Sequence, residues 1–331
     1  EVSKKIANAL KTADVNHFQD IRIGVSIGIT LFPDHSTETL QLMKNADVAM
    51  YQAKRTGLDY FVYNEVSNNS KFITVSREQA LINAIENNEL LLHFQPKVDI
   101  TTGHLVGVEA LVRWQANGTL IYPGEFIPYA EKTGTIKRLT SWVLNTAIEQ
   151  LSVWNSTGKE LKMSVNISAA DLSDPIFSSD IAEYLNRWHV DPNHLILEIT
   201  ETGVMTDPNK ARKILDEIDE LGIEISIDDF GTGYSSLVYL KKLPVNELKI
   251  DRSFVSDILM NADSMVIVRS IIDLAHNLGI IVTAEGVENK EVWDVLSIMG
   301  CDIAQGYYLG KPMNSVDFEN TTLYEKILVN F

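Results

Sequence analysis

The sequence has little of what several protein classes require. Its single cysteine, Cys301, excludes an internal disulfide and fits a reducing compartment. No apolar run approaches the ~20 residues that cross a bilayer, and the first ten residues lack the apolar segment of a signal peptide. We therefore expect a cytoplasmic fragment with no membrane contact of its own. Because residue 1 is not Met, we interpret the chain as a piece of a longer protein, in which a membrane anchor remains open.

Basic residues are also scarce. The chain has 28 Lys and Arg against 45 Asp and Glu, a formal net charge of −17. This balance argues against a nucleic-acid polymer as partner, because such binding is dominated by Lys and Arg that neutralise phosphates. A phosphate-ester substrate would need bound divalent cations to approach so acidic a protein, and such cations would also account for clustered carboxylates.

The length and the balance of apolar and charged residues are those of a globular protein. With 331 residues, of which 45% are hydrophobic and 22% charged, the chain has room for one large barrel-type domain and part of another. We expect the partial domain at the N-terminus, over residues 1–64. Residues 65–75 are polar and predict a linker, and residues 76–331 form the main domain.

Residues 1–64 predict an incomplete α+β module. A helical start precedes an apolar strand over 21–30, a helix over 37–57 and a short strand over 59–64. So few elements cannot easily bury a core alone. The segments VSIGIT, NADVAMYQAKRTG and YFVYN resemble the C-terminal part of a GGDEF (diguanylate cyclase) domain. The GG[DE]EF signature of that family is absent, so the resemblance implies a remnant without cyclase activity of its own.

From Leu90 onward, strands and helices alternate. Ser76 and Gln79 have the spacing of a capping box that starts a helix before the first strand. The first two strands are joined only by ITTG, which is too short for a crossover helix, so we expect an antiparallel hairpin. Eight strands in about 250 residues indicate an α/β fold, a (β/α)₈ TIM-type barrel with an antiparallel first strand.

Polar side chains end nearly every predicted barrel strand. In EISIDDFGTG, period two places Ser226 and Asp228 on one face, and Asp229 follows where we expect the strand to end. Functional groups of such barrels project from the C-terminal ends of the strands, so these side chains should meet at one rim. Any one of these polar residues is explained by a solvated strand end or a turn. Their recurrence on the same face at the ends of successive strands favours a functional site. The set is Glu109, Asn166, Glu198, Asp228, Asp229, Lys249, Asp251, Glu285 and Gln305.

The donor types indicate a hard cation. The seven histidines show no HxxxH spacing, and with one cysteine this disfavours zinc or iron bound by nitrogen and sulfur. Carboxylate and amide oxygens suit Mg²⁺ or Mn²⁺. GTGYSS at 231–236 is no dinucleotide fingerprint, because two acids precede it and Ser236 replaces the last glycine. Two metals bridged by one carboxylate would favour in-line phosphodiester hydrolysis.

The motif EALVR at 109–113 is accompanied, in order, by further motifs: FQPKVD before it, then NIS, LEITE, DDFGTGYSSL, LKIDRSF, TAEGVE and QGYYLGKP. Residues 76–314 thereby resemble an EAL domain, the cyclic di-GMP phosphodiesterase family. The resemblance implies hydrolysis of this bacterial second messenger to linear 5′-pGpG by a water activated by two Mg²⁺ or Mn²⁺ ions. It also implies a barrel whose first strand is antiparallel.

The resemblance also implies a role for each residue of the site. Glu109, Asn166, Glu198, Asp228 and Asp229 would be metal ligands, with Asp228 bridging the two ions. Lys249 and Glu285 would orient or deprotonate the water, Arg113 and Gln95 would contact the substrate, and Gln305 would hold a water or the nucleotide. Glu201 is similar to the residue that steadies the DDFGTG loop, and Asp251 and Glu288 to acids one layer behind the ligands.

Other interpretations stay open at this point. The domain could be a catalytically silent receptor of cyclic di-GMP that signals through a missing N-terminal part. A third interpretation is a barrel enzyme for a carbonyl substrate, with Lys249 as base and metals that hold an enolate. The segment YSSLVYLKKL after Asp229 predicts a homodimer contact, or else a short helix packed on its own barrel.

Overall fold

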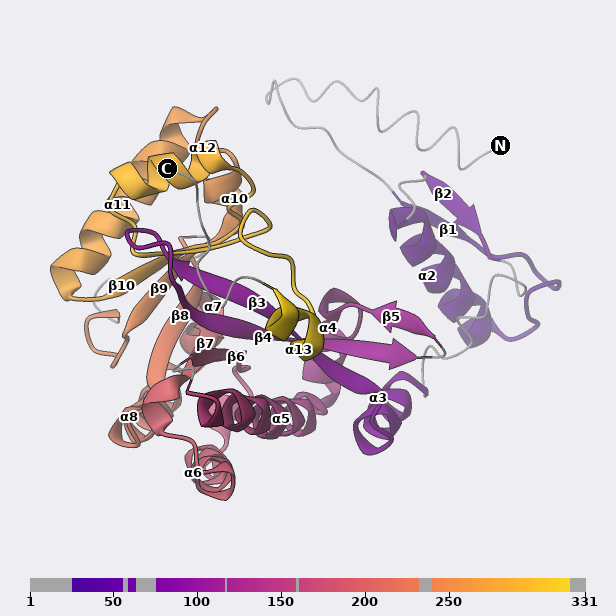
Figure 1. Ribbon diagram of the computed structural model, residues 1–331. Coiled ribbons are helices and arrows are strands. Elements are labelled where there is room, and N and C mark those ends of the chain that lie inside the picture. The colour runs from indigo at the N-terminus through magenta and orange to yellow at the C-terminus, as the bar shows by residue number, and fades with distance from the viewer. Residues whose placement is uncertain are drawn as a thin grey trace. The chain divides into compact units, whose positions relative to one another are not determined.

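The computed structural model describes residues 26–55, 59–63, 76–116, 118–158, 161–231 and 240–321 (Figure 1). The chain divides into two compact units, Glu1–Ser76 and Arg77–Phe331. Within the described ranges, no helix is both long and apolar enough to span a bilayer. The predicted linker at 65–75 and the segment 232–239, which holds most of the predicted dimer contact, lie outside the described residues.

The described residues of the N-terminal unit, 26–55 and 59–63, form a parallel strand pair and a helix. β1 (Ile27–Ile29) pairs with β2 (Tyr60–Val62), and α2 (Thr39–Arg55) connects them, as a parallel pair requires. A Cβ on Gly28 would lie only 1.9 Å from the carbonyl oxygen of Ala46, so glycine is what lets the helix approach the strand closely. The predicted helical start of this unit falls outside the described residues.

The second unit is a closed eight-stranded barrel, as the sequence predicts. The strands follow the order β3, β11, β10, β9, β8, β7, β6 and β4, and a β3–β4 pairing closes the ring. β3 is antiparallel to both neighbours, whereas the remaining barrel pairs are parallel. The strand bounds are β3 (Leu90–Asp99), β4 (Leu105–Ala116), β6 (Lys162–Asn166), β7 (Leu195–Thr200), β8 (Glu224–Phe230), β9 (Glu247–Ile250), β10 (Ile281–Ala284) and β11 (Ile303–Gln305).

Helices lie on the outside of these strands (Figure 1). Val165, Leu197, Ile225 and Leu248 are fully buried between strands and helices, and they alternate with the polar residues that point into the barrel. A short strand, β5 (Thr119–Ile121), extends β4 as a hairpin. The helix bounds are α3 (Ser76–Glu86), α4 (Pro123–Thr133), α5 (Ile136–Ser156), α6 (Phe177–Trp188), α7 (Glu201–Met205), α8 (Pro208–Glu220), α10 (Arg252–Ser256), α11 (Ala262–Leu278), α12 (Lys290–Ile298) and α13 (Ser315–Asn320), with 3₁₀ turns η2 (Asp171–Ser173) and η3 (Pro192–His194).

Four of these helices were not predicted, for two physical reasons. α4 contains two prolines, but Pro123 occupies the first turn, where its missing N–H leaves no hydrogen bond unmade. α7, α10 and α13 are too short to show a periodic pattern. Each follows a side chain that accepts a hydrogen bond from the first turn, namely Thr200, Asp251 and Asn314.

An aromatic cluster holds α13 against the barrel. Trp154 of α5 lies between Phe94 of β3, at a ring-centroid distance of 4.9 Å, and Phe318 of α13, at 5.0 Å. All three rings are buried, and the indole nitrogen of Trp154 donates to Glu319 Oε1 at 2.7 Å. The short α13 is therefore stabilised by packing and not by its own length.

We expect Phe318→Ala to destabilise the barrel by about 3–5 kcal/mol, because it removes a buried ring and leaves a cavity beside Trp154. The free energy of unfolding can be measured in guanidinium with tryptophan fluorescence as the probe. Val316→Ala, at an exposed position of the same helix, should change it by less than about 0.5 kcal/mol. Equal effects of the two substitutions would contradict the packing role of Phe318.

Candidate active site

Lys249 of β9 lies at the centre of a ring of acids. Its side chain is fully buried, and Nζ is 2.5 Å from Glu198 Oε2 and 2.6 Å from Glu285 Oε1. Asp228 Oδ1 at 3.5 Å and Glu109 Oε2 at 3.7 Å complete the ring. The four acids come from or directly follow four different strands, β4, β7, β8 and β10. The strand ends thus bring together residues that lie far apart in the sequence.

Asp229 joins this ring because of its backbone conformation. The sequence predicts that the strand ends where Asp229 follows Asp228, but β8 continues to Phe230. Adjacent side chains of a regular strand point to opposite faces, yet the left-handed φ of 55° at Asp229 breaks this alternation. The register with β9 shifts at the same place. A non-glycine residue in this region costs about 1–3 kcal/mol, and here it places two adjacent carboxylates on one side.

Amide side chains fix the carboxylate of Glu109. Asn166 Nδ2 donates to Glu109 Oε1 at 2.6 Å, and Gln305 Nε2 donates to Glu109 Oε2 at 2.6 Å. Gln305 Nε2 also donates to Gln95 Oε1 at 3.1 Å, and Gln95 in turn donates to the carbonyl oxygen of Gly310. Gln305 Oε1 is buried without a hydrogen-bond partner among the described residues. A buried acceptor of this kind is suited to a donor on a bound molecule.

The acids of the ring differ in how readily they ionise. Burial alone would raise the pKa of Glu198, but Lys249 and Lys97 outweigh it and lower that pKa to about 2. Burial raises the pKa of Glu285 to about 8 in spite of the nearby Lys249 ammonium. Burial also raises the pKa values of Glu109 and Asp228. Two ammonium groups therefore keep Glu198 ionised, whereas at Glu109, Asp228 and Glu285 the attraction to Lys249 lowers the pKa by less than burial raises it.

Arg113 lies on β4 above the ring and is held by an aromatic residue. Its guanidinium stacks over Tyr122 at 5.3 Å from the ring centroid and donates to the Val112 carbonyl oxygen at 2.8 Å. Arg113 Nε is buried without a hydrogen-bond partner among the described residues. We did not predict Tyr122, although the β4–β5 hairpin, in which Trp114 pairs with Ile121, brings it opposite Arg113.

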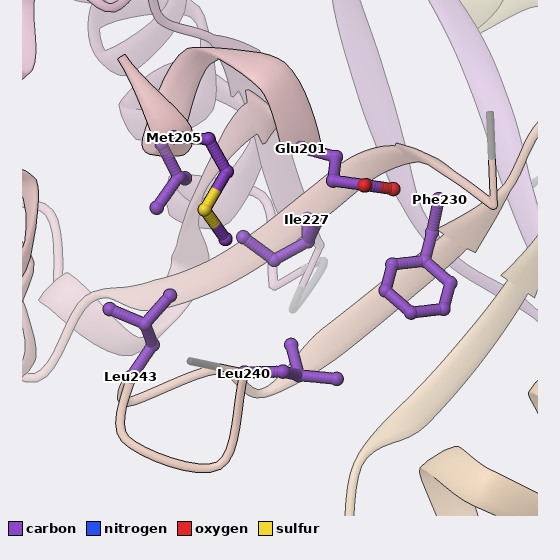
Figure 2. A pocket seen from close by; sticks show the side chains of 7 residues that line it. Glu201, Met205, Ile227, Phe230, Leu240 and Leu243 are labelled. Atoms are coloured by element: carbon purple, nitrogen blue, oxygen red, sulfur yellow. The ribbon is translucent and has the colours of Figure 1, made fainter. Parts of the chain in front are cut away.

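Glu201 lies in α7, away from the Lys249 ring. Its carboxylate accepts a hydrogen bond from the backbone N–H of Gly231 at 3.2 Å. Figure 2 shows it beside Phe230 and Ile227 at a small apolar cavity, with Leu240 and Leu243 on the opposite side. The contact ties the turn after β8 to α7.

Asp251 and Glu288 each have another partner. Asp251 caps α10 by accepting from the Ser253 N–H at 3.0 Å, and it also interacts with Asp229. Glu288 is exposed and forms an ion pair with Arg252 at 2.5 Å. Asp251 therefore lies next to Asp229, whereas Glu288 links the loop after β10 to the start of α10.

Sequence reasoning missed a second polar layer below the ring. Lys97 Nζ donates to Glu247 Oε1 at 2.8 Å and to Ser164 Oγ at 3.1 Å, and the Thr283 hydroxyl donates to Glu247. The strand period could have indicated that each of the two side chains points inward, but not that they meet. Lys97 is two residues after Gln95 and Glu247 two before Lys249, so both point into the barrel.

The donor set of the rim fits a hard divalent cation. Asp228, Asp229 and Glu285 each offer a carboxylate oxygen, and these oxygens lie within 4.8 Å of one another. In the described part of the chain, this is the group of three or more acidic, histidine or cysteine residues that could hold an ion. The family resemblance implies that Glu285 acts on the water, and its carboxylate oxygen also lies close enough to those of Asp228 and Asp229 to hold an ion. Oxygen ligands without sulfur or imidazole suit Mg²⁺ or Mn²⁺.

Two protein families match different parts of this chain. The EAL domain family matches residues 78–312, and the family described as diguanylate cyclase, GGDEF domain, matches residues 1–59. The chain belongs to the EAL domain family. Its N-terminal residues match the GGDEF family, so both predicted resemblances are confirmed.

Relatives of this EAL chain include longer proteins. It is 42% identical over 301 residues to "Bifunctional diguanylate cyclase/cyclic di-GMP phosphodiesterase MucR" of Pseudomonas aeruginosa, a match over 89% of this chain and 43% of MucR. It is 35% identical over 302 residues to "Cyclic di-GMP phosphodiesterase PdeR" of Escherichia coli, over 91% of this chain and 46% of PdeR. The chain therefore spans less than half the length of these two relatives.

Solved structures of EAL proteins share the fold. The structure "PaMucR Phosphodiesterase, c-di-GMP complex" has a TM-score of 0.71 at 41% identity and covers 74% of this chain and 100% of that chain. The cAMP- and cyclic-di-GMP-bound form of the EAL enzyme Bd1971 has a TM-score of 0.71 at 32% identity, over 86% of this chain and 76% of that one. Both similarities support the barrel assignment.

We expect Lys249→Met to destabilise the EAL barrel by about 3–5 kcal/mol in buffer free of divalent cations, because it leaves Glu198 buried without its main counter-charge. Thermal and denaturant unfolding in EDTA measure the loss. As a matched control, Lys137→Met removes a partly exposed partner of Asp174 and should cost about 0–1 kcal/mol. If both variants unfold alike, Lys249 is not the central counter-charge.

Proposed function

We propose that the EAL barrel hydrolyses one phosphodiester bond of cyclic di-GMP and releases linear 5′-pGpG. The observation that carries this proposal is the acid ring around Lys249, which joins side chains from four strands at one rim. Membership of the EAL family supports the substrate, because the relatives MucR and PdeR are named cyclic di-GMP phosphodiesterases.

Two divalent cations, Mg²⁺ or Mn²⁺, belong to the proposal. Asp228, Asp229 and Glu285 would hold them together with the neighbouring Glu109, Asn166 and Glu198. When bound, such ions polarise phosphoryl oxygens and lower the pKa of a water molecule. The carboxylate cluster at the rim supports this assignment.

The residues of the chain would orient the reactants and move the proton. Lys249 and Glu285, 2.6 Å apart, would position the attacking water, and Glu285 would accept its proton. The water oxygen forms a bond to phosphorus while the bond from phosphorus to the 3′ oxygen breaks. The 3′ oxygen takes up a proton from the surrounding water and becomes the 3′-hydroxyl of the product, which carries the 5′-phosphate. Arg113, stacked on Tyr122, would bind a phosphate oxygen of the substrate.

Glu201 would act indirectly, through the turn that follows β8. Its bond to the Gly231 N–H holds the chain two residues after Asp229, and a shift there would move both aspartates. The homodimer contact, the cytoplasmic setting and the domain boundaries at residues 64 and 76 stay predictions.

The purified protein should convert cyclic di-GMP to pGpG with Mg²⁺ or Mn²⁺, and EDTA should stop the reaction. Glu109→Ala should lower turnover by at least ~100-fold, within the range for loss of one group that stabilises a transition state. Glu149→Ala, at an exposed position of α5, serves as the control. Chromatography of the nucleotides gives the readout.

Absence of product would reject the proposal, and separate measurements of nucleotide and metal binding would then distinguish the alternatives. Binding of cyclic di-GMP without product would identify a silent receptor. Metal binding without any hydrolysis or nucleotide binding would favour the carbonyl enzyme. Equal turnover by Glu109→Ala and the parent would remove Glu109 from the site.

Arg113→Ala should raise KM for cyclic di-GMP about 10–100-fold, because a hydrogen bond to a charged group contributes about 1.5–3 kcal/mol. The effect on kcat should be smaller if Arg113 contacts the substrate equally before and during the reaction. Arg138→Ala removes an exposed partner of Glu86 and should leave KM unchanged. An unaltered KM in Arg113→Ala would reject its role in substrate binding.

A further inference from the structure

A second buried layer of charge lies beneath the acid ring. Lys97 of β3 and Glu247 of β9 are 2% and 4% exposed, and their charged groups are 2.8 Å apart. Barrel interiors are ordinarily filled by branched apolar side chains, and burying two ions costs desolvation free energy that apolar residues would not. A buried pair at this level therefore calls for a physical explanation beyond filling space.

The pair is connected to one acid of the ring. Lys97 Nζ lies 3.4 Å from Glu198 Oε1, while Lys249 Nζ lies 2.5 Å from Glu198 Oε2. The Ser164 hydroxyl, which accepts from Lys97, also hydrogen-bonds to Glu198. Two ammonium groups from two strands thus hold the two oxygens of one fully buried carboxylate, which fixes both its position and its plane.

Glu247 determines where Lys97 can lie. Both of its carboxylate oxygens accept from Lys97, at 2.8 and 3.0 Å, and Thr283 donates to it from the neighbouring strand. The four charges of Lys97, Lys249, Glu198 and Glu247 sum to zero. Glu198 is therefore neutralised by the protein itself, whereas Glu109, Asp228 and Glu285 form their ion pairs within the described residues with Lys249 only.

We propose that Lys97, held by Glu247, is a positioning residue that presets the Glu198 carboxylate for a divalent cation at the rim. It acts through Glu198 and does not touch the substrate. The kinetic part of this inference rests on the proposed function, whereas the metal-binding part does not. Partners that orient a metal ligand typically change metal affinity or activity about 10–100-fold when removed.

A neutralised double variant separates positioning from stability. In Lys97→Met/Glu247→Gln, the methionine keeps most of the lysine stem, and the glutamine keeps an oxygen for Thr283, so no buried charge is left unpaired. Three quantities are measured: the unfolding temperature in EDTA, the affinity for Mn²⁺ alone from the electron paramagnetic resonance signal of the free ion, and kcat and KM at several Mn²⁺ concentrations.

The double variant should unfold near the parent temperature but bind Mn²⁺ about 10–100-fold more weakly. Turnover should require correspondingly more Mn²⁺, with KM for cyclic di-GMP little changed. The control is Lys162→Met/Glu224→Gln, which makes the same substitutions in a pair 2.5 Å apart at the N-terminal ends of β6 and β8. It should keep the parent Mn²⁺ affinity.

Parent Mn²⁺ affinity in a stable double variant would overturn the proposal. If that variant does not fold, Lys97→Leu/Glu247→Leu/Thr283→Val, the apolar filling usual for barrels, takes its place with the same expected loss of affinity. A parent that binds Mn²⁺ but makes no pGpG would end the proposed function and leave this inference testable. A parent that binds no Mn²⁺ would overturn both.

Discussion

The site depends on one buried ammonium. Lys249 lies within 4 Å of four carboxylates that come from four parts of the barrel. Removing a carboxylate from water costs several kcal/mol even after relaxation, and four of them could not meet inside a barrel without a counter-charge. The lysine lets the strand ends converge, and the raised pKa values of Glu285, Glu109 and Asp228 show that one positive charge does not fully compensate them.

Convergence at the rim also requires a departure from regular strand geometry. An ideal strand delivers every second side chain to the interior, which accounts for Glu198, Lys249 and Gln305. Asp229 reaches the same side only through its left-handed backbone. Glu201 accepts from the N–H two residues later, so the strained turn is held from outside the ring. The strained backbone of Asp229 and the hydrogen bond from Gly231 to Glu201 together allow two adjacent acids to face the same side.

The sequence allowed the barrel and most of the rim to be predicted, because both follow from local rules. Alternation within a strand gives the inward face, and the short ITTG connection gives the antiparallel start. The conformation of Asp229 and the Lys97–Glu247 pair could not be predicted in this way. Which inward residues meet depends on how β3 and β9 are placed across the closed barrel, and no strand contains that information by itself. Helix α4 was missed because prolines usually indicate a turn, whereas here Pro123 lies in the first turn and Pro128 is accommodated in the helix interior.

The charge balance of the two layers explains why a metal is the natural partner of this rim. In the lower layer, Lys97 and Glu247 cancel, and Glu198 is matched to Lys249 at 2.5 Å. Among the described residues, Glu109, Asp228 and Glu285 at the rim then share the charge of Lys249 with Glu198. A phosphodiester anion would be repelled by these acids, since like charges at short range raise the free energy of both. Divalent cations bound there would make the local electrostatic potential positive. The excess of acidic over basic residues at the rim therefore serves the proposed reaction, because it holds the cations that attract the anionic substrate.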